Sequence, residues 1–367
     1  MRVFRILRTI LVAALIVGAC APQQANVAPT GTLAPTIIPT PSPLPAASPS
    51  VRPTATAAPT PSPTPSPDPY PELGSFGSAG DGYYAINAGT IKETVRYLAS
   101  KKLQGRRAGT IAGGEAAGYL AKILEDIGVK PVNGDYFQPF ELKTEYYTTQ
   151  AHNVWGIIEG SSKKDEYILI TAHFDGLGAI DKKTFFGADD NASGTAAVLE
   201  VARAFAALSA NGMPSARSVL IVLFDGEEAG LKGSAYFAKH LPVAKEKIIG
   251  AINLDMVGRG DNSTVYMYGA PNVKKFKKEN LALYDALIAA NTVVKLELTY
   301  PATNTSFTHS DQWSLYSKGI TNVLLLNTGK HSDYHKTTDT ADKLNYSKIE
   351  RIARLVFLTA WQLANKN

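Results

Sequence analysis

The segment SVLIVLF at 218–224 places the strongest constraint on how this chain folds. After Ser218, every residue of the segment is large and apolar. A strand with one face in water alternates polar and apolar residues, whereas a continuous apolar run is typical of a strand buried on both faces. Such strands belong mainly to parallel sheets covered by helices on either side. The segment therefore predicts a central strand of an α/β protein.

The rest of the chain from residue 91 onward alternates in the same way. Further strand-like segments lie at 167–172, 247–255 and 321–327. Apolar residues at helical spacing occur in six segments: 91–103, 113–128, 193–210, 233–241, 274–291 and 346–365. Ser193 is placed to cap the third of these helices. Strands alternating with helices of this length predict a three-layer α/β/α sandwich with a mostly parallel central sheet.

The first 20 residues have the features of a targeting segment. The basic start MRVFRILR precedes the apolar run TILVAALIVG. That run suits a signal peptide better than a bilayer span, which needs about 20 residues. It ends in Val17-Gly18-Ala19-Cys20, which resembles a bacterial lipobox with Cys20 as the lipidated residue. The alternative is an ordinary small-residue cleavage site with an incidental cysteine.

Residues 21–72 have the composition of a disordered linker. They hold 16 of the 22 prolines, mixed with Thr, Ser and Ala. Such a segment lacks the apolar residues that would repay ordering and favours extended polyproline II. We therefore expect 1–72 to tether a folded domain at 73–367 to a bacterial membrane. The domain would be extracytoplasmic, either on the cell surface or in the periplasm.

The charge balance gives no reason to expect a nucleic-acid partner. The formal net charge is +5, and Arg2, Arg5 and Arg8 lie in the predicted signal peptide. Without these three arginines the balance is 5 − 3 = +2. A nearly neutral domain lacks the basic surface that binds phosphate backbones.

Acidic residues and histidines follow each predicted strand. Ligands of open α/β sheets bind beyond the carboxyl ends of the strands. The segment GADDNASG at 187–194 lies at the same predicted edge. The residues involved are His173, Asp175, Asp189, Asp190, Asp225, Glu227, Glu228, Asp255, His331, Asp333 and His335. Their joint placement predicts a single polar site.

Histidines with carboxylates form a ligand set that suits zinc. This set has more carboxylates than one zinc requires, and two metals bridged by a carboxylate would use them. One member of the pair Asp189-Asp190 would be that bridge, and the residues alone do not decide which. Taken singly, the aspartate pair could instead favour a helix N-terminus, and Glu227-Glu228 could be a solvated turn.

Six motifs give the chain a family resemblance over roughly 91–365. It resembles the co-catalytic dinuclear zinc aminopeptidases, which include secreted leucine-type aminopeptidases and aminopeptidase Y. Glutamate carboxypeptidase and glutaminyl cyclase are relatives of that family. The motifs, in the family's order, are LQGRRAGT, AHFDG, GADDNASGTAAVLE, FDGEEAGLKGS, INLDMVG and DYHKTTDT.

The resemblance implies two zinc ions per chain and a role for each matching residue. Asp190 would bridge the metals. His173 and Asp255 would complete one metal site, and Glu228 and His335 would complete the other.

The resemblance also implies the catalytic groups. Glu227 would be the general base, and Asp175 would accept a hydrogen bond from His173 and fix its orientation. Asp189 would be a neighbour of the metals rather than a ligand. The reaction would be hydrolysis of the N-terminal peptide bond by a zinc-activated water, on peptides with a free N-terminus. We expect a monomer.

Three features depart from the pattern or leave a choice open. Many relatives carry Ser-Asp-His where this chain has Ser310-Asp311-Gln312, with His309 one place earlier. His331 is a rival to His335 as a ligand. Arg259 is the lone arginine near the motifs that could bind a substrate α-carboxylate, which favours an aminopeptidase.

Other activities remain compatible with the same two-metal site. They are those of a carboxypeptidase, a dipeptidase or an N-acyl-amino-acid deacylase. A glutaminyl cyclase fits less well. A catalytically inactive, lipid-anchored binding module is a further alternative, but such a protein should have lost a ligand or the base, and this chain keeps all of them.

Overall fold

The computed structural model describes residues 70–269, 281–301 and 305–366. All of them lie in one compact unit, Pro65–Asn367. The predicted signal peptide, the predicted lipid site at Cys20 and the linker up to residue 69 lie outside the described residues. The described part begins three residues before the predicted domain start, in a 3-10 helix, η1 (Pro71–Ala79). Within it, no helix is both long enough and apolar enough to cross a membrane.

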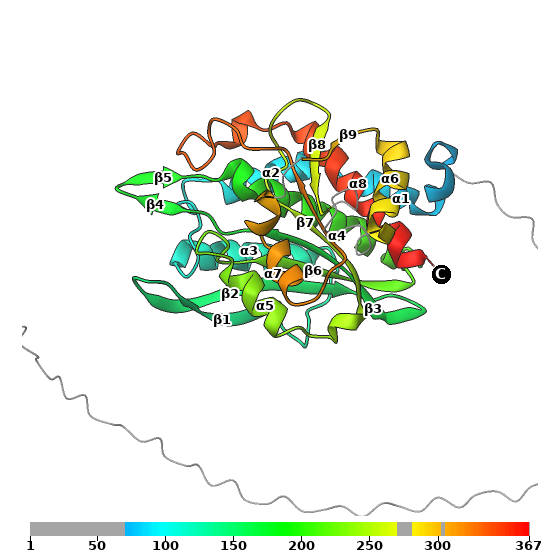
Figure 1. The fold of residues 1–367 in the computed structure, drawn as a ribbon, viewed down its shortest axis with the longest axis horizontal. Helices are drawn as coiled ribbons and strands as arrows, with labels where there is room; N and C mark the ends of the chain where they lie inside the picture. The colour runs from blue at the N-terminus through cyan, green and yellow to red at the C-terminus, as the bar shows by residue number, and fades with distance from the viewer. Residues whose placement is uncertain (1–69, 270–280, 302–304, 367) are drawn as a thin grey trace, which may run out of the picture. The chain divides into compact units, whose positions relative to one another are not determined.

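An eight-stranded sheet forms the middle layer, in the order β1-β2-β6-β3-β7-β10-β8-β9 (Figure 1). The strands are β1 (Phe137–Lys143), β2 (Thr148–Ile158), β3 (Lys163–His173), β6 (Arg217–Phe224), β7 (Ile248–Leu254), β8 (Thr264–Tyr268), β9 (Glu297–Thr299) and β10 (Val323–Asn327). The four central strands, β6, β3, β7 and β10, are parallel. Antiparallel pairing occurs where β2 meets β1 and β6, and where β8 meets β10.

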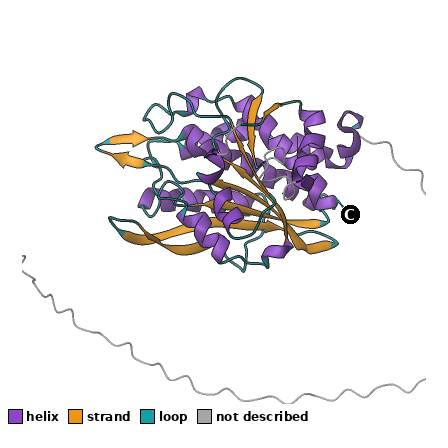
Figure 2. Cartoon of the chain, in the orientation of Figure 1, coloured by secondary structure: helices purple, strands orange, loops and turns teal. Residues whose placement is uncertain are grey.

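Helices flank the sheet, as Figure 2 shows. They are α1 (Gly80–Ala85), α2 (Ala88–Leu98), α3 (Ile111–Asp126), α4 (Gly194–Ala210), α5 (Lys232–Lys239), α6 (Leu281–Val294), α7 (Gln312–Ser317) and α8 (Tyr346–Asn365). Ile168 and Ile170 of β3 share one apolar cluster with α2, α3, α4, α6 and α8. Leu169, between them, belongs to a second cluster with α5 and α7. This alternation follows from the two-residue period of a strand and confirms the predicted three-layer fold.

The structure agrees with the predicted core strands and helices and adds elements that the sequence patterns missed. The antiparallel strands β1, β2 and β8 lack the long apolar runs that identify the central strands. A small hairpin, β4 (Gly178–Ile180) with β5 (Lys183–Phe185), was also missed. The predicted helix at 274–291 is described only from Leu281.

Ser193 occupies the N-cap position of α4, as predicted, but its side chain does not make the capping hydrogen bond. Its hydroxyl donates to the carbonyl of Asp189 and accepts from the amide of Val257. Asn191 takes the capping role, because its side-chain oxygen accepts from the Gly194 amide at 2.9 Å. The loop before α4 is therefore tied both to the helix and to the segment that follows β7.

The Arg106 guanidinium holds together the loops at the carboxyl end of β3. Its side chain is 0% exposed. Nε donates to the carbonyl of Phe174 at 2.5 Å, and Nη2 donates to the carbonyls of Gly187 and Asp190 at 2.6 and 3.1 Å. Nη1 donates to the carbonyls of Phe186 and Leu98. A planar, permanently charged group with five donors is suited to this arrangement.

Replacing Arg106 with Met should lower the free energy of unfolding by about 3–5 kcal/mol, because several buried carbonyls would lose their donor. Denaturant unfolding measures the change. The matched control is Arg96→Met, at an exposed position of α2, which should alter stability by less than about 0.5 kcal/mol. Equal effects of the two substitutions would contradict the role given to Arg106.

Candidate metal centre

The carboxyl ends of the parallel strands bring the predicted site residues together. His173 is the last residue of β3, and Asp255 directly follows β7. Glu227 and Glu228 lie in the turn after β6, and His335 lies in the loop after β10. Asp190 comes from the irregular helical turn η2 (Ala188–Ser193) that precedes α4.

These side chains form two adjacent groups. Ligand atoms of His173, Glu227 and Asp255 all lie within 4.8 Å of one another, and so do those of Asp190, Glu228 and His335. Nε2 of His173 lies 3.4 Å from Oδ1 of both Asp190 and Asp255.

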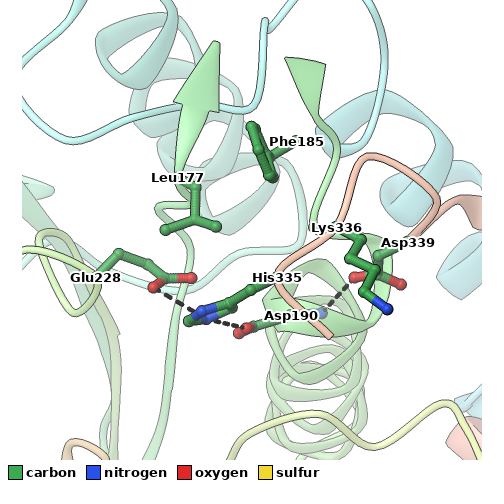
Figure 3. A pocket seen from close by; sticks show the side chains of 8 residues that line it. Leu177, Phe185, Asp190, Glu228, His335, Lys336 and Asp339 are labelled. Atoms are coloured by element: carbon green, nitrogen blue, oxygen red, sulfur yellow. Dashed lines mark hydrogen bonds and ion pairs between the residues drawn. The ribbon is translucent and has the colours of Figure 1, made fainter. Parts of the chain in front are cut away.

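Asp190 connects the two groups. Its Oδ1 faces His173, whereas its Oδ2 lies 3.1 Å from Nε2 of His335. The same His335 nitrogen lies 3.3 Å from Oε2 of Glu228. Figure 3 shows His335 between Glu228 and Asp190, with Leu177 and Phe185 on the other side of a small pocket. One carboxylate thus presents a different oxygen to each histidine.

The spacing of these atoms fits metal ligands. Four-coordinate zinc, with bonds of 2.0–2.2 Å, separates its ligand atoms by about 3.3–3.6 Å. The four separations between the two histidines and their carboxylates, 3.1–3.4 Å, are close to this value. They exceed the 2.7–2.9 Å that is typical of charge-assisted hydrogen bonds. Oδ1 of Asp255 is buried and has no hydrogen-bond partner among the described residues.

Asp175 supports both the histidine and the glutamate turn. Its Oδ1 accepts from the Glu227 amide at 2.9 Å, and its Oδ2 accepts from the Glu228 amide at 3.3 Å. Oδ1 also lies 3.5 Å from Nδ1 of His173, which is a longer contact than the predicted hydrogen bond. Asp175 is 1% exposed, so these contacts fix the relative positions of β3 and the turn after β6.

Asp339 holds the loop that carries Asp189 and Asp190. The Asp339 carboxylate accepts from the amides of Asp189 and Asp190 at 3.0–3.1 Å. The Asp189 side chain accepts from the Gly258 amide at 2.7 Å and lies 3.2 Å from Nε2 of His331. Asp189 and His331 therefore pair with each other, and neither belongs to the two ligand groups.

Arg259 is engaged within the fold. Its Nη2 donates to Asp333 at 2.6 Å, and its Nη1 lies 3.8 Å from Asp339. Asp333 also accepts from Thr338 and Lys343, so it forms a separate ionic cluster. Asp225 accepts weakly from the amide of His152 at 3.3 Å and lies outside both ligand groups.

The concentrated negative charge shifts several pKa values. Hydrogen bonds to Asp190 and Glu228 raise the pKa of His335 to about 10. Burial opposes charge on His173, but the carboxylates around it leave its pKa well above the usual value. Burial raises the pKa of Glu227 well above its usual range, although His173 acts in the opposite direction. A cluster of this kind binds protons strongly and would bind a divalent cation in their place.

Asp311 is a site neighbour to which the sequence assigned no function. It is 0% exposed, and burial raises its pKa to about 7. It is near enough to Glu227 for its charge to raise the Glu227 pKa. In the sequence, the departure from Ser-Asp-His at 310–312 is the feature that marks this position. Gln312 beside it accepts from Asn253 of β7 at 2.8 Å and donates to the Phe307 carbonyl, so its amide is engaged in the fold.

Comparison with known proteins gives the fold and the family. A solved structure named "Aminopeptidase from Aneurinibacillus sp. strain AM-1" superposes with a TM-score of 0.62 at 18% identity. The superposition covers 79% of this chain and 97% of that one. At this identity the likeness shows a shared fold.

Curated relatives match over part of their length. "Glutamate carboxypeptidase 2 homolog" of Caenorhabditis elegans is 31% identical over 169 residues, 46% of this chain and 20% of its own length. "Probable leucine aminopeptidase" of Trichophyton verrucosum (strain HKI 0517) is 26% identical over 247 residues, 66% of this chain and 62% of its own length. The profile of peptidase family M28 matches residues 153–360, which is more than half of the chain and spans both ligand groups. The chain therefore belongs to peptidase family M28.

Proposed function

We propose that this protein is a metal-dependent aminopeptidase that uses two zinc ions. The observation that carries the proposal is the Asp190 carboxylate, whose two oxygens face His173 and His335 at 3.4 and 3.1 Å. This arrangement suits a bridging ligand between two cations. Membership of family M28 and the aminopeptidase among its relatives support the choice of reaction.

His173, Asp255 and Asp190 would hold one metal, and Glu228, His335 and Asp190 would hold the other. When bound, the two ions supply Lewis-acid chemistry and lower the pKa of a nearby water to about 7. The ligand chemistry suits zinc, and cobalt or manganese would also fit it.

Glu227 is the proposed proton carrier. Its carboxylate lies with His173 and Asp255, and Asp175 holds its backbone amide. Since His173, Asp255 and Asp190 already supply three ligands to the metal on that side, Glu227 is not needed as a ligand and can act as a base. It takes the proton of the attacking water and returns it to the amine of the departing peptide.

The acidic character of the site favours a substrate with a free amine. Arg259, the lone candidate from the sequence for binding a substrate α-carboxylate, is paired with Asp333 and Asp339. Carboxylates in both ligand groups would attract an N-terminal ammonium group. The carboxypeptidase and deacylase alternatives receive no such support from Arg259.

The cellular location also stays a proposal. Residues 1–72 would act as signal peptide, lipid attachment site and spacer, and would anchor the enzyme outside the cytoplasm of a bacterium. Globomycin-sensitive processing and labelling by a palmitate analogue that is lost in Cys20→Ser would support it.

Asp190→Asn should remove the bridging ligand, because an amide nitrogen cannot bind a cation. We expect zinc content, measured by plasma emission spectrometry after gel filtration, to fall from about two ions per chain to one or fewer. Asp189→Asn is the matched control, since an amide oxygen can still accept from the Gly258 amide. Loss of zinc in the Asp189 variant alone would reverse the assignment.

Glu227→Gln should lower kcat by about 10²–10⁴-fold, which is the usual contribution of a general base. Zinc content should stay at the wild-type value. Glu141→Gln, at an exposed position of β1, should change neither quantity. If the Glu227 variant lost zinc in step with activity, Glu227 would be a ligand rather than the base.

The choice of reaction is tested with a leucyl peptide and its N-acetylated form. We expect cleavage of the unblocked peptide alone, loss of cleavage after chelation and recovery when zinc is restored. Cleavage of the acetylated peptide would move the assignment to a carboxypeptidase or deacylase. Zinc binding without cleavage of either would support an inactive binding module.

A further inference from the structure

Two pockets lie along β4, and the first of them reaches the ligand groups. The first, of about 260 Å³, is lined by Glu228 and Asp175 at its inner end and by Ile180 of β4. The second, of about 450 Å³, is lined by Gly178 and Ala179 of β4 and by Ile111 at the start of α3. Arg107 lines both pockets, so they adjoin each other at its side chain, and the two together are here called the groove.

Arg107 lies at the junction of the two pockets and is held in place. An ideal Cβ at Gly178 would lie 2.8 Å from Cβ and 3.2 Å from Cδ of Arg107, so the arginine stem packs across this glycine. The guanidinium carbon lies 5.5 Å from the centre of the Tyr147 ring. An arginine whose stem packs against a glycine and whose guanidinium lies near an aromatic ring loses little freedom when it binds a ligand.

Arg107 has no acidic partner within the described part of the chain. It differs in this from Lys102, which lines the same groove and lies 3.4 Å from Glu115. The guanidinium of its neighbour Arg106, in contrast, donates to backbone carbonyls inside the fold. Arg107 is therefore a positioned, exposed cation beside a groove that begins at Glu228.

We propose that this groove binds the leaving part of the peptide substrate and that Arg107 binds a carboxylate on it. The inference rests on the proposed aminopeptidase function, because only the leaving part of such a substrate continues beyond the cleaved bond. The second pocket, on the other side of Arg107, offers space for that continuation. The carboxylate is either the C-terminus of a short peptide or an acidic side chain.

The apolar surface around the groove supports a peptide occupant. Ile111, Tyr146 and Ile180 are 86%, 84% and 44% exposed, and each lines one of the two pockets. Exposed apolar side chains beside a cleft are typical of a binding surface. Glu145 also lines the first pocket and would favour a basic residue in the substrate. A preference for acidic substrates therefore indicates Arg107, and a preference for basic substrates indicates Glu145.

The test uses matched substrates with N-terminal leucine. Leu-Gly-Gly and its C-terminal amide differ only in the terminal carboxylate, and Leu-Glu-amide and Leu-Gln-amide differ only in the side-chain carboxylate. For one of these pairs, wild type should show a higher kcat/KM for the carboxylate form. In Arg107→Gln that ratio should fall about three- to tenfold, while Arg96→Gln, which also loses one exposed arginine, keeps the wild-type ratio.

The same pairs are also titrated into zinc-loaded Glu227→Gln, with and without Arg107→Gln, so that binding is measured without turnover. The expected result is a matching fall in the affinity ratio. If the affinity ratio depended on Arg107 but the wild-type protein cleaved none of the peptides, the proposed reaction would be rejected and the groove assignment would stand. Equal ratios with and without Arg107, a preference for Leu-Lys-amide, or no binding of any peptide would overturn the inference.

Discussion

The whole site depends on negative charge gathered in a poorly solvated place. Asp175, Asp190 and Asp255 are 1%, 6% and 9% exposed, and Glu227 and Glu228 lie beside them. Carboxylates this close and this buried repel one another and are costly to keep ionised. The parallel sheet imposes the arrangement, because β3, β6, β7 and β10 end at the same edge. Cations, whether protons or the proposed zinc ions, are what allow these groups to remain together.

The surrounding fold keeps this cluster in one geometry. Asp175 joins β3 to the turn after β6, and Asp339 holds the amides of the aspartate pair. Burial lowers the pKa of Arg106, but the nearby carboxylates oppose this shift and its guanidinium binds the loops on both sides. Two of the loops that carry ligands, the turn after β6 and the loop of the aspartate pair, are thus fixed by buried carboxylate-to-amide contacts. Preorganisation of this kind is what a metal site requires.

The sequence predicted the sheet core and the convergence of the site residues, because both follow from local patterns. Apolar runs identify strands buried on both faces, and their ends must meet at one edge. Other features depend on contacts between distant residues. Asp189 and Asp190 are equivalent in the sequence, and only the pairing of Asp189 with Gly258 and His331 separates them. Ser193 and Asn191 are both good caps, and tertiary contacts decided between them. Sequence spacing also does not reveal that Arg259 forms ion pairs with Asp333 and Asp339. Nor does it reveal that Arg107 has no acidic partner among the described residues.

The two ligand groups differ in their access to water. The side chain of His173 is 1% exposed, whereas that of His335 is 39% exposed. His335 also comes from a long loop, while His173 ends a central strand. If two ions bind as proposed, we therefore expect them to exchange at different rates. The ion at His335 would be exchanged or replaced by another metal more readily than the ion at His173, whose side chain is almost completely shielded from water. A mixed-metal protein, with different elements in the two positions, would be accessible by order of addition alone.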